Sequence, residues 1–142
     1  MLASMPVTSE DVRAVALSLP RAYEASPVRG RDRLRVREHR TFRVGRIVFA
    51  SISPDETLLG FGFPREEREA LVASEPEKFQ LPRTSDLRYQ WVVARMAALD
   101  TEELHELVTD AWVMCVPRSV SEAHLARPGA RPGARPGARP GD

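Results

Sequence analysis

Two parts of the chain have apolar residues at the three- and four-residue spacing of an amphipathic helix. The first part begins after Thr8 or Ser9, which are suitable N-cap residues, and should end at Pro20. The second follows Asp100-Thr101-Glu102-Glu103, which has the pattern of a capping box, and should end at Pro117. The apolar stripes are Val12, Val15, Ala16 and Leu19 in the first helix, and Leu104, Leu107, Val108, Ala111, Trp112 and Cys115 in the second. Each stripe is predicted to face the core.

Alternation of apolar and polar residues between positions 41 and 63 predicts three strands. The first two strands should pair through a tight turn at Gly45-Arg46, and a turn at residues 53–56 should lead to the third. In the third strand Leu59, Phe61 and Phe63 share one face, whereas Leu58, Gly60 and Gly62 share the other. The two glycines either let a helix approach the sheet closely or mark a bulge, and the sequence leaves both interpretations open.

The next elements are a short helix after Pro64, a loop over residues 79–90 and a strand over residues 91–96. The connections between the first strands are too short for parallel crossovers, so the sheet should be antiparallel with helices packed on one face. The predicted fold class is therefore α+β with two layers. A chain of 142 residues is expected to form one such domain, and we place it at residues 8–118.

Residues 119–142 are predicted to be a disordered tail. Its main feature is the tetrapeptide Ala-Arg-Pro-Gly, repeated four times from Ala126 to Gly141. Proline in every repeat blocks helix formation, and there is no large apolar side chain to offset the entropy of ordering the chain. The tail also carries four arginines, which either form a flexible arm for nucleic acid or have no function.

The charge of the chain is unevenly distributed although its net value is only +1. Eight arginines lie between positions 29 and 46, where Asp32 and Glu38 are the only acids. The candidate phosphate-binding residues are Arg29, Arg31, Arg33, Arg35, Arg37, Arg40, Arg43 and Arg46. The alternative role for the same arginines is pairing with the glutamate-rich helices or with a protein partner.

The sequence does not predict catalytic chemistry. It has no Gly-rich phosphate loop and no GxSxG motif, and its histidines, His39, His105 and His124, lack metal-ligand spacing. The single cysteine, Cys115, lies on an apolar stripe, where a buried thiol is expected rather than a reactive one. We therefore expect no enzyme activity, no metal and no cofactor. Trp91 and Trp112 are predicted to lie in the core.

Three segments together resemble the MmcQ/YjbR family of small bacterial proteins. They are residues 42–50 (FRVGRIVFA), residues 64–71 (PREEREAL), and Trp91-Val92-Val93 followed by the helix that contains Glu102 and Cys115. The resemblance covers about residues 8–118. It implies an antiparallel two-layer fold in a secretion-chaperone-like arrangement and a DNA-binding function, with no catalytic residues. The sequence has Gly45-Arg46 where relatives usually have Gly-Lys, and an arginine-rich loop longer than expected for the family.

The resulting hypothesis is a cytoplasmic, non-enzymatic DNA-binding protein that contacts phosphates with little readout of sequence. The alternative is a protein-interaction or chaperone-like module without a nucleic-acid ligand. No apolar stretch approaches the roughly 20 residues of a membrane span, and no signal peptide is recognised at the N-terminus. The sequence does not indicate an oligomeric state.

Overall fold

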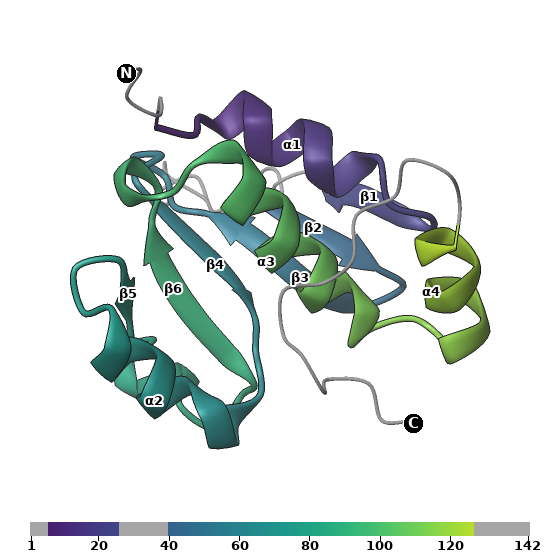
Figure 1. The fold of residues 1–142 in the computed structure, drawn as a ribbon. Helices are drawn as coiled ribbons and strands as arrows, with labels where there is room; N and C mark the ends of the chain where they lie inside the picture. The colour runs from purple at the N-terminus through teal and green to yellow at the C-terminus, as the bar shows by residue number, and fades with distance from the viewer. Residues whose placement is uncertain (1–5, 26–39, 127–142) are drawn as a thin grey trace, which may run out of the picture.

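The computed structural model describes residues 6–25 and 40–126, and these form an antiparallel sheet with helices on one side (Figure 1). The sheet has six strands in the order β1-β2-β3-β4-β6-β5, and all its pairings are antiparallel. The strands are β1 (Ala22–Ala25), β2 (Arg40–Val44), β3 (Ile47–Ile52), β4 (Leu58–Gly62), β5 (Phe79–Gln80) and β6 (Trp91–Arg95). The α+β class and the two-layer arrangement predicted from the sequence are confirmed.

Four α-helices complete the described part of the chain: α1 (Ser9–Leu17), α2 (Arg65–Ser74), α3 (Thr101–Val113) and α4 (Arg118–Leu125). Helix α1 begins with a capping box in which the Thr8 hydroxyl accepts from the Asp11 amide and the Asp11 carboxylate accepts from the Thr8 amide. At the start of α3, the Asp100 carboxylate accepts from the amide of Glu103. In Figure 1, α1 and α3 lie side by side in front of the sheet.

Alternation along the strands gives the sheet two different faces. The face under α1 and α3 carries buried side chains that include Phe42, Ile52, Leu59, Phe61 and Val92. The opposite face, which we call the uncovered face, carries a row of cross-strand neighbours. This row is Thr41, Ser51, Gly60, Val93 and Gln80. The core therefore lies on one side of the sheet, and no helix of the described residues covers the other side.

Helix α3 connects several parts of the core through Trp112. The Trp112 side chain is fully buried, and its indole Nε1 donates to the Pro20 carbonyl oxygen at 2.9 Å. The imidazole of His124 in α4 lies with its centroid 5.1 Å from that of the Trp112 ring. The predicted burial of Trp112 is confirmed.

The structure corrects several element boundaries. Strands β1 and β5 were not expected, and both are short, with four and two residues. Helix α1 ends at Leu17 rather than reaching Leu19, although Leu19 is buried. The predicted disordered tail from residue 119 is wrong over residues 119–125, because these residues belong to α4 and contact Trp112 through His124. The Ala-Arg-Pro-Gly repeat beyond Ala126 lies outside the described residues.

Candidate functional site

A pocket of about 1030 Å³ lies on the uncovered face. Its floor is the sheet, with Ser51, Gly60 and Val93 at the centre. The segment between β5 and β6, which includes Leu81, Arg83 and Tyr89, forms one wall. The volume of the pocket is close to the upper limit of the range of about 300–1,000 Å³ that is usual for ligand sites. The pocket is the best-formed candidate site in the described part of the chain.

The pocket extends to the C-terminal end of α3 because β3 and β4 pair over only part of their length. Their pairing starts at Ala50↔Phe61, which leaves Ile47 and Val48 of β3 without a partner in β4. Beyond this point Gly62 approaches α3, and a Cβ added to Gly62 would lie 3.6 Å from the Ala111 Cβ. Helix α3 therefore lies next to Gly62, but an alanine would also fit there, so the approach does not require a glycine.

Trp91 lies on the uncovered face rather than in the core, so its predicted core position is wrong. Its side chain is partly exposed and lines the pocket, and its indole occupies the space beside Gly60. A Cβ at Gly60 would be only 2.8 Å from Cζ2 and from Nε1 of the indole. The glycine in β4 thus makes room for a tryptophan of β6. Sequence alone did not indicate this role, because the indole reaches Gly60 diagonally from its register partner Gly62, and this pairing forms only in the sheet.

Arg68 of α2 anchors the backbone of the pocket wall through hydrogen bonds. This guanidinium is buried, with 7% of the residue exposed. It donates from Nη1 to the carbonyl oxygens of Tyr89 at 2.8 Å and Trp91 at 3.1 Å, and from Nη2 to that of Leu87. No sequence pattern singled out Arg68, because the carbonyl groups that it binds lie 19–23 residues away in the chain.

The three described arginines of the candidate phosphate-binding set do not lie together. By strand alternation Arg43 lies on the uncovered face, opposite Val48 of β3, and its Nε donates to the Thr41 hydroxyl at 3.2 Å. Arg46 is exposed in the β2–β3 turn, which confirms the predicted hairpin. Arg40 is on the opposite face, and its Nη1 is buried without a hydrogen-bond partner among the described residues. Arg29, Arg31, Arg33, Arg35 and Arg37 lie outside the described residues.

Two further arginines stand at the pocket wall, and neither was in the candidate set. Arg83 has 78% of its side chain exposed and pairs with Asp86 at 3.4 Å. Arg88 places its guanidinium 4.9 Å from the centroid of the Tyr89 ring and donates to the Tyr89 hydroxyl at 2.9 Å. Of these arginines only Arg83 lines the pocket, whereas Arg88 adjoins the lining residue Tyr89 and Arg43 lies opposite the lining residue Val48.

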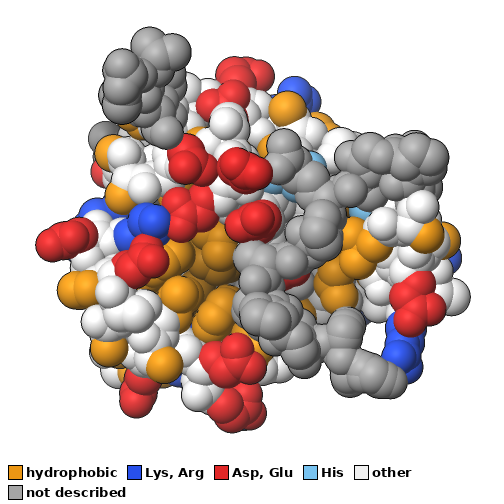
Figure 2. Space-filling model, viewed as in Figure 1, with side chains coloured by type: hydrophobic (Ala, Val, Ile, Leu, Met, Phe, Trp, Pro, Cys, Tyr) orange, Lys and Arg blue, Asp and Glu red, His pale blue; other side chains and the backbone are white. Residues whose placement is uncertain are grey.

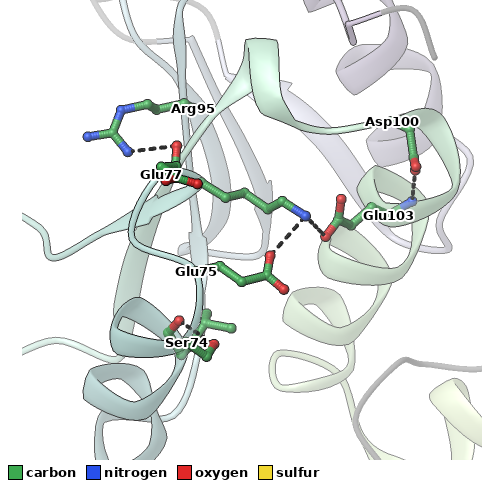
Figure 3. A network of polar contacts seen from close by, with 8 residues as sticks. Ser74, Glu75, Glu77, Arg95, Asp100 and Glu103 are labelled. Atoms are coloured by element: carbon green, nitrogen blue, oxygen red, sulfur yellow. Dashed lines mark hydrogen bonds and ion pairs between the residues drawn. The ribbon is translucent and has the colours of Figure 1, made fainter. Parts of the chain in front are cut away.

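The helix-covered side of the molecule is acidic. The four helices contain ten acidic residues and four arginines. Figure 2 shows these carboxylates gathered around an apolar surface on this side. Lys78 lies between two of them, 2.9 Å from Glu75 and 2.6 Å from Glu103, and so links the end of α2 to the start of α3 (Figure 3). Burial opposes the charge of Lys78, but the two carboxylates outweigh it and raise its pKa.

The described titratable groups of the pocket include one thiol. Cys115 lines the pocket near the end of α3, and burial raises the pKa of its thiol from 9.0 to about 11. Such a thiol is almost entirely protonated at neutral pH and is a poor nucleophile. Within the described ranges, no group of three or more His, Cys, Asp and Glu side chains is placed to hold a metal ion. In the same ranges, no helix has the length and apolar character needed to cross a membrane.

Comparison with solved structures identifies the same architecture in a protein of Deinococcus radiodurans. Protein DR2400 of Deinococcus radiodurans, which contains the family domain DUF419, superposes with a TM-score of 0.65. The match covers 94% of this chain and 97% of that one at 20% sequence identity. At this level of identity the similarity shows a shared fold.

Sequence comparison finds related proteins in mycobacteria. The uncharacterized proteins Rv2570 of Mycobacterium tuberculosis and Mb2600 of Mycobacterium bovis are each 37% identical to this chain over 60 residues. The match covers 42% of this chain and 46% of the relatives, so the chain matches about half the length of these curated proteins. The YjbR family model matches residues 17–114, which is more than half of the chain. This match agrees with the resemblance found in three sequence segments and with the superposed fold, and the chain belongs to the YjbR family.

Proposed function

We propose that this YjbR-family chain is a non-enzymatic DNA-binding protein and that nucleic acid approaches the uncovered face of its sheet. The observation that carries the proposal is the division of charge between the two sides of the molecule. Arg83 lines the pocket, and Arg43 and Arg88 lie beside residues that line it. Carboxylates dominate the helices on the other side (Figure 2). A polyanion is attracted to the first side and repelled by the second, so the charge division orients the complex.

The arginines around the pocket are suitably placed for phosphate contacts. Arg83 lines the pocket, and Arg88 adjoins the lining residue Tyr89 in the same wall. On the β2–β3 side, Arg43 lies opposite the lining residue Val48, and Arg46 directly precedes the lining residue Ile47. Asp86 is the only acid among the residues lining the pocket, and Arg83 neutralises it. Guanidinium groups on both sides of one pocket can hold a sugar-phosphate chain that crosses it.

The arginine-rich segment contributes to the same proposal through its position in the chain. Its arginines from Arg29 to Arg37 directly precede β2, and β2 carries Arg43 on the uncovered face. We propose that this segment adds phosphate contacts at that edge of the sheet. Few base-reading side chains accompany the arginines, so binding should depend weakly on sequence.

The test is a titration of the full chain with a labelled single-stranded oligonucleotide and a labelled duplex at several salt concentrations. Replacing Arg43, Arg83 and Arg88 together by Gln should flatten the slope of log affinity against log salt. For the single strand, the slope should change by about 2, because each lost phosphate contact contributes about 0.7 to the slope. The control variant is Arg118→Gln, which removes an exposed arginine of α4 that pairs with Glu122. A salt-independent affinity, or equal slopes for the triple variant and the control, would refute DNA binding at this face.

The apolar lining of the pocket favours a second candidate function. Ile47, Val48, Leu58, Leu81 and Met114 all line it, and such a surface also suits the side chains of an extended peptide. This candidate is the protein-interaction module. It would gain support if an uncharged apolar peptide bound with a salt-independent affinity and neither oligonucleotide bound.

A further inference from the structure

We infer that the pocket on the uncovered face accepts an unpaired nucleobase that stacks on the indole of Trp91. The inference rests on the proposed function and specifies the form of nucleic acid, namely a single strand or an extruded base. It is carried by three features of the pocket: an aromatic surface, a fixed wall and polar groups beside an apolar floor.

The aromatic surface is the indole of Trp91. The ring lies against β4, where Gly60 leaves space that no other residue type would leave, and it is partly exposed to the pocket. The other tryptophan of the chain, Trp112, is fully buried on the opposite side of the sheet. A large aromatic ring at the floor of an open pocket offers a base a face on which to stack, whatever the identity of the base.

The backbone that carries the indole is anchored before any ligand arrives. Arg68 donates to the carbonyl oxygens of Tyr89 and Trp91, on both sides of Gln90. The Gln90 carbonyl oxygen accepts from the Phe63 amide at 3.1 Å, and its side-chain Oε1 accepts from the Arg65 amide at 3.3 Å. The backbone that carries the aromatic residues is therefore anchored at successive positions. Such preorganisation lowers the entropy lost on binding.

The pocket also has the polar groups and the size that a base requires. Thr41, Ser51 and Gln80 line it with two hydroxyl groups and one amide, which can both donate and accept hydrogen bonds at a base edge. Its volume of about 1030 Å³ exceeds the space that one base needs, so part of the adjoining strand also fits. The surrounding arginines Arg43 and Arg83 stand on different sides of the pocket and can take the flanking phosphates.

A base within a duplex cannot make this contact, because its faces are already covered by its neighbours in the stack. Extrusion from a duplex requires the base to be unpaired and unstacked, and a single strand avoids most of this cost. The pocket should therefore give single strands an advantage over duplexes that phosphate contacts alone do not provide.

The experiment compares three labelled probes of equal length with the full chain: oligothymidylate, the same backbone made fully abasic, and a duplex. The variants are Trp91→Leu, which removes the stacking surface, and Trp91→Phe, which keeps an aromatic ring. Trp91→Leu should weaken oligothymidylate binding by about 5- to 150-fold, the range for loss of one base–aromatic stack. It should leave abasic binding unchanged, and Trp91→Phe should restore most of the lost affinity. Oligothymidylate should also quench the wild-type tryptophan fluorescence, and the abasic probe should not.

The outcomes separate this inference from the proposed function. If wild-type protein binds oligothymidylate and abasic probes equally and no quenching occurs, phosphate binding stands and the base pocket is refuted. If Trp91→Leu weakens both probes equally, Trp91 only supports the fold, and the inference is again wrong. If no probe binds with a salt-dependent affinity, the proposed function fails, and the base pocket fails with it.

Discussion

The indole of Trp91 occupies the place where a side chain at Gly60 would begin. An ideal Cβ on Gly60 would lie 2.8 Å from two atoms of the ring, closer than real Cβ contacts allow. Gly62, two residues along the same strand, has a different neighbour, because its Cβ would lie 3.6 Å from the Ala111 Cβ in an ordinary contact. These two glycines therefore form a matched pair for testing the position of the indole.

Gly60→Ala is expected to displace the Trp91 ring and lower the free energy of unfolding by about 1–3 kcal/mol, as overpacking does. Gly62→Ala should change it by less than about 1 kcal/mol, with stabilisation expected where the extra methyl group fits. Urea unfolding measures both values, and the tryptophan emission spectrum should shift only in Gly60→Ala. Equal stability and equal spectra for the two variants would contradict the observed position of the indole.

Arg68→Met should lower the free energy of unfolding by about 2–4 kcal/mol. The substitution removes the hydrogen bonds to the carbonyl oxygens of Leu87, Tyr89 and Trp91, and the gain from no longer burying a cation offsets part of the loss. Arg68→Lys should recover only part of the stability, because an ammonium group lacks the fork that reaches several carbonyl groups. Arg118→Gln, an exposed control, should change stability by less than about 0.5 kcal/mol. A fully stable Arg68→Met protein would show that the buried guanidinium does not hold the wall.

Cys115 should react slowly with iodoacetamide in the folded protein at pH 8 and quickly after unfolding in urea. Burial raises the pKa of the folded thiol to about 11, so few molecules carry the reactive thiolate at that pH. Mass spectrometry after timed alkylation measures the two rates. Comparable rates in the folded and unfolded protein would contradict a buried thiol.

The raised pKa of Cys115 also predicts that the protein becomes less stable at high pH. Between pH 9 and pH 11 the unfolded thiol loses its proton while the folded thiol keeps it, so the folded state binds more protons. The free energy of unfolding should therefore decrease as pH rises through this window, by at most about 1.4 kcal/mol per pH unit from this group. Cys115→Ser should remove this contribution, and a comparison of urea unfolding at pH 8 and pH 10.5 measures the difference between the two proteins.

Removal of residues 127–142 should leave the midpoint of thermal unfolding unchanged within about 1 °C. This segment has no large apolar side chain to contribute to a core. Removal of residues 118–142 should lower the midpoint by several degrees, because it also deletes α4 and the contact between His124 and Trp112. Differential scanning calorimetry of the two truncated chains measures the effect. If the longer deletion has no effect, α4 does not stabilise the domain.

The local pattern of apolar and polar residues was sufficient to predict the helices and strands that bury one face. Helix α3 followed from its apolar stripe and from Asp100, and the β2–β3 hairpin followed from alternation around Gly45-Arg46. The antiparallel sheet with helices on one face followed from the short connections between these elements. These features depend on residues close together in the chain, whose periodicity records which side is buried.

The candidate site is formed by contacts between residues that are distant in the chain, and no local sequence pattern predicts such contacts. Trp91 was predicted to lie in the core because the apolar residues Val92 and Val93 follow it. Strand alternation and the β4–β6 register place it on the other face, where its indole lies beside Gly60. Nothing in the local sequence distinguishes Arg68 from the other charged residues of its helix, because its hydrogen-bond partners lie 19–23 residues away. Sequence by itself determined which segments are helices and strands and which faces are apolar. Strand register and the docking of α2 decided which residues meet at the pocket, because these contacts join distant residues and form only when the sheet assembles.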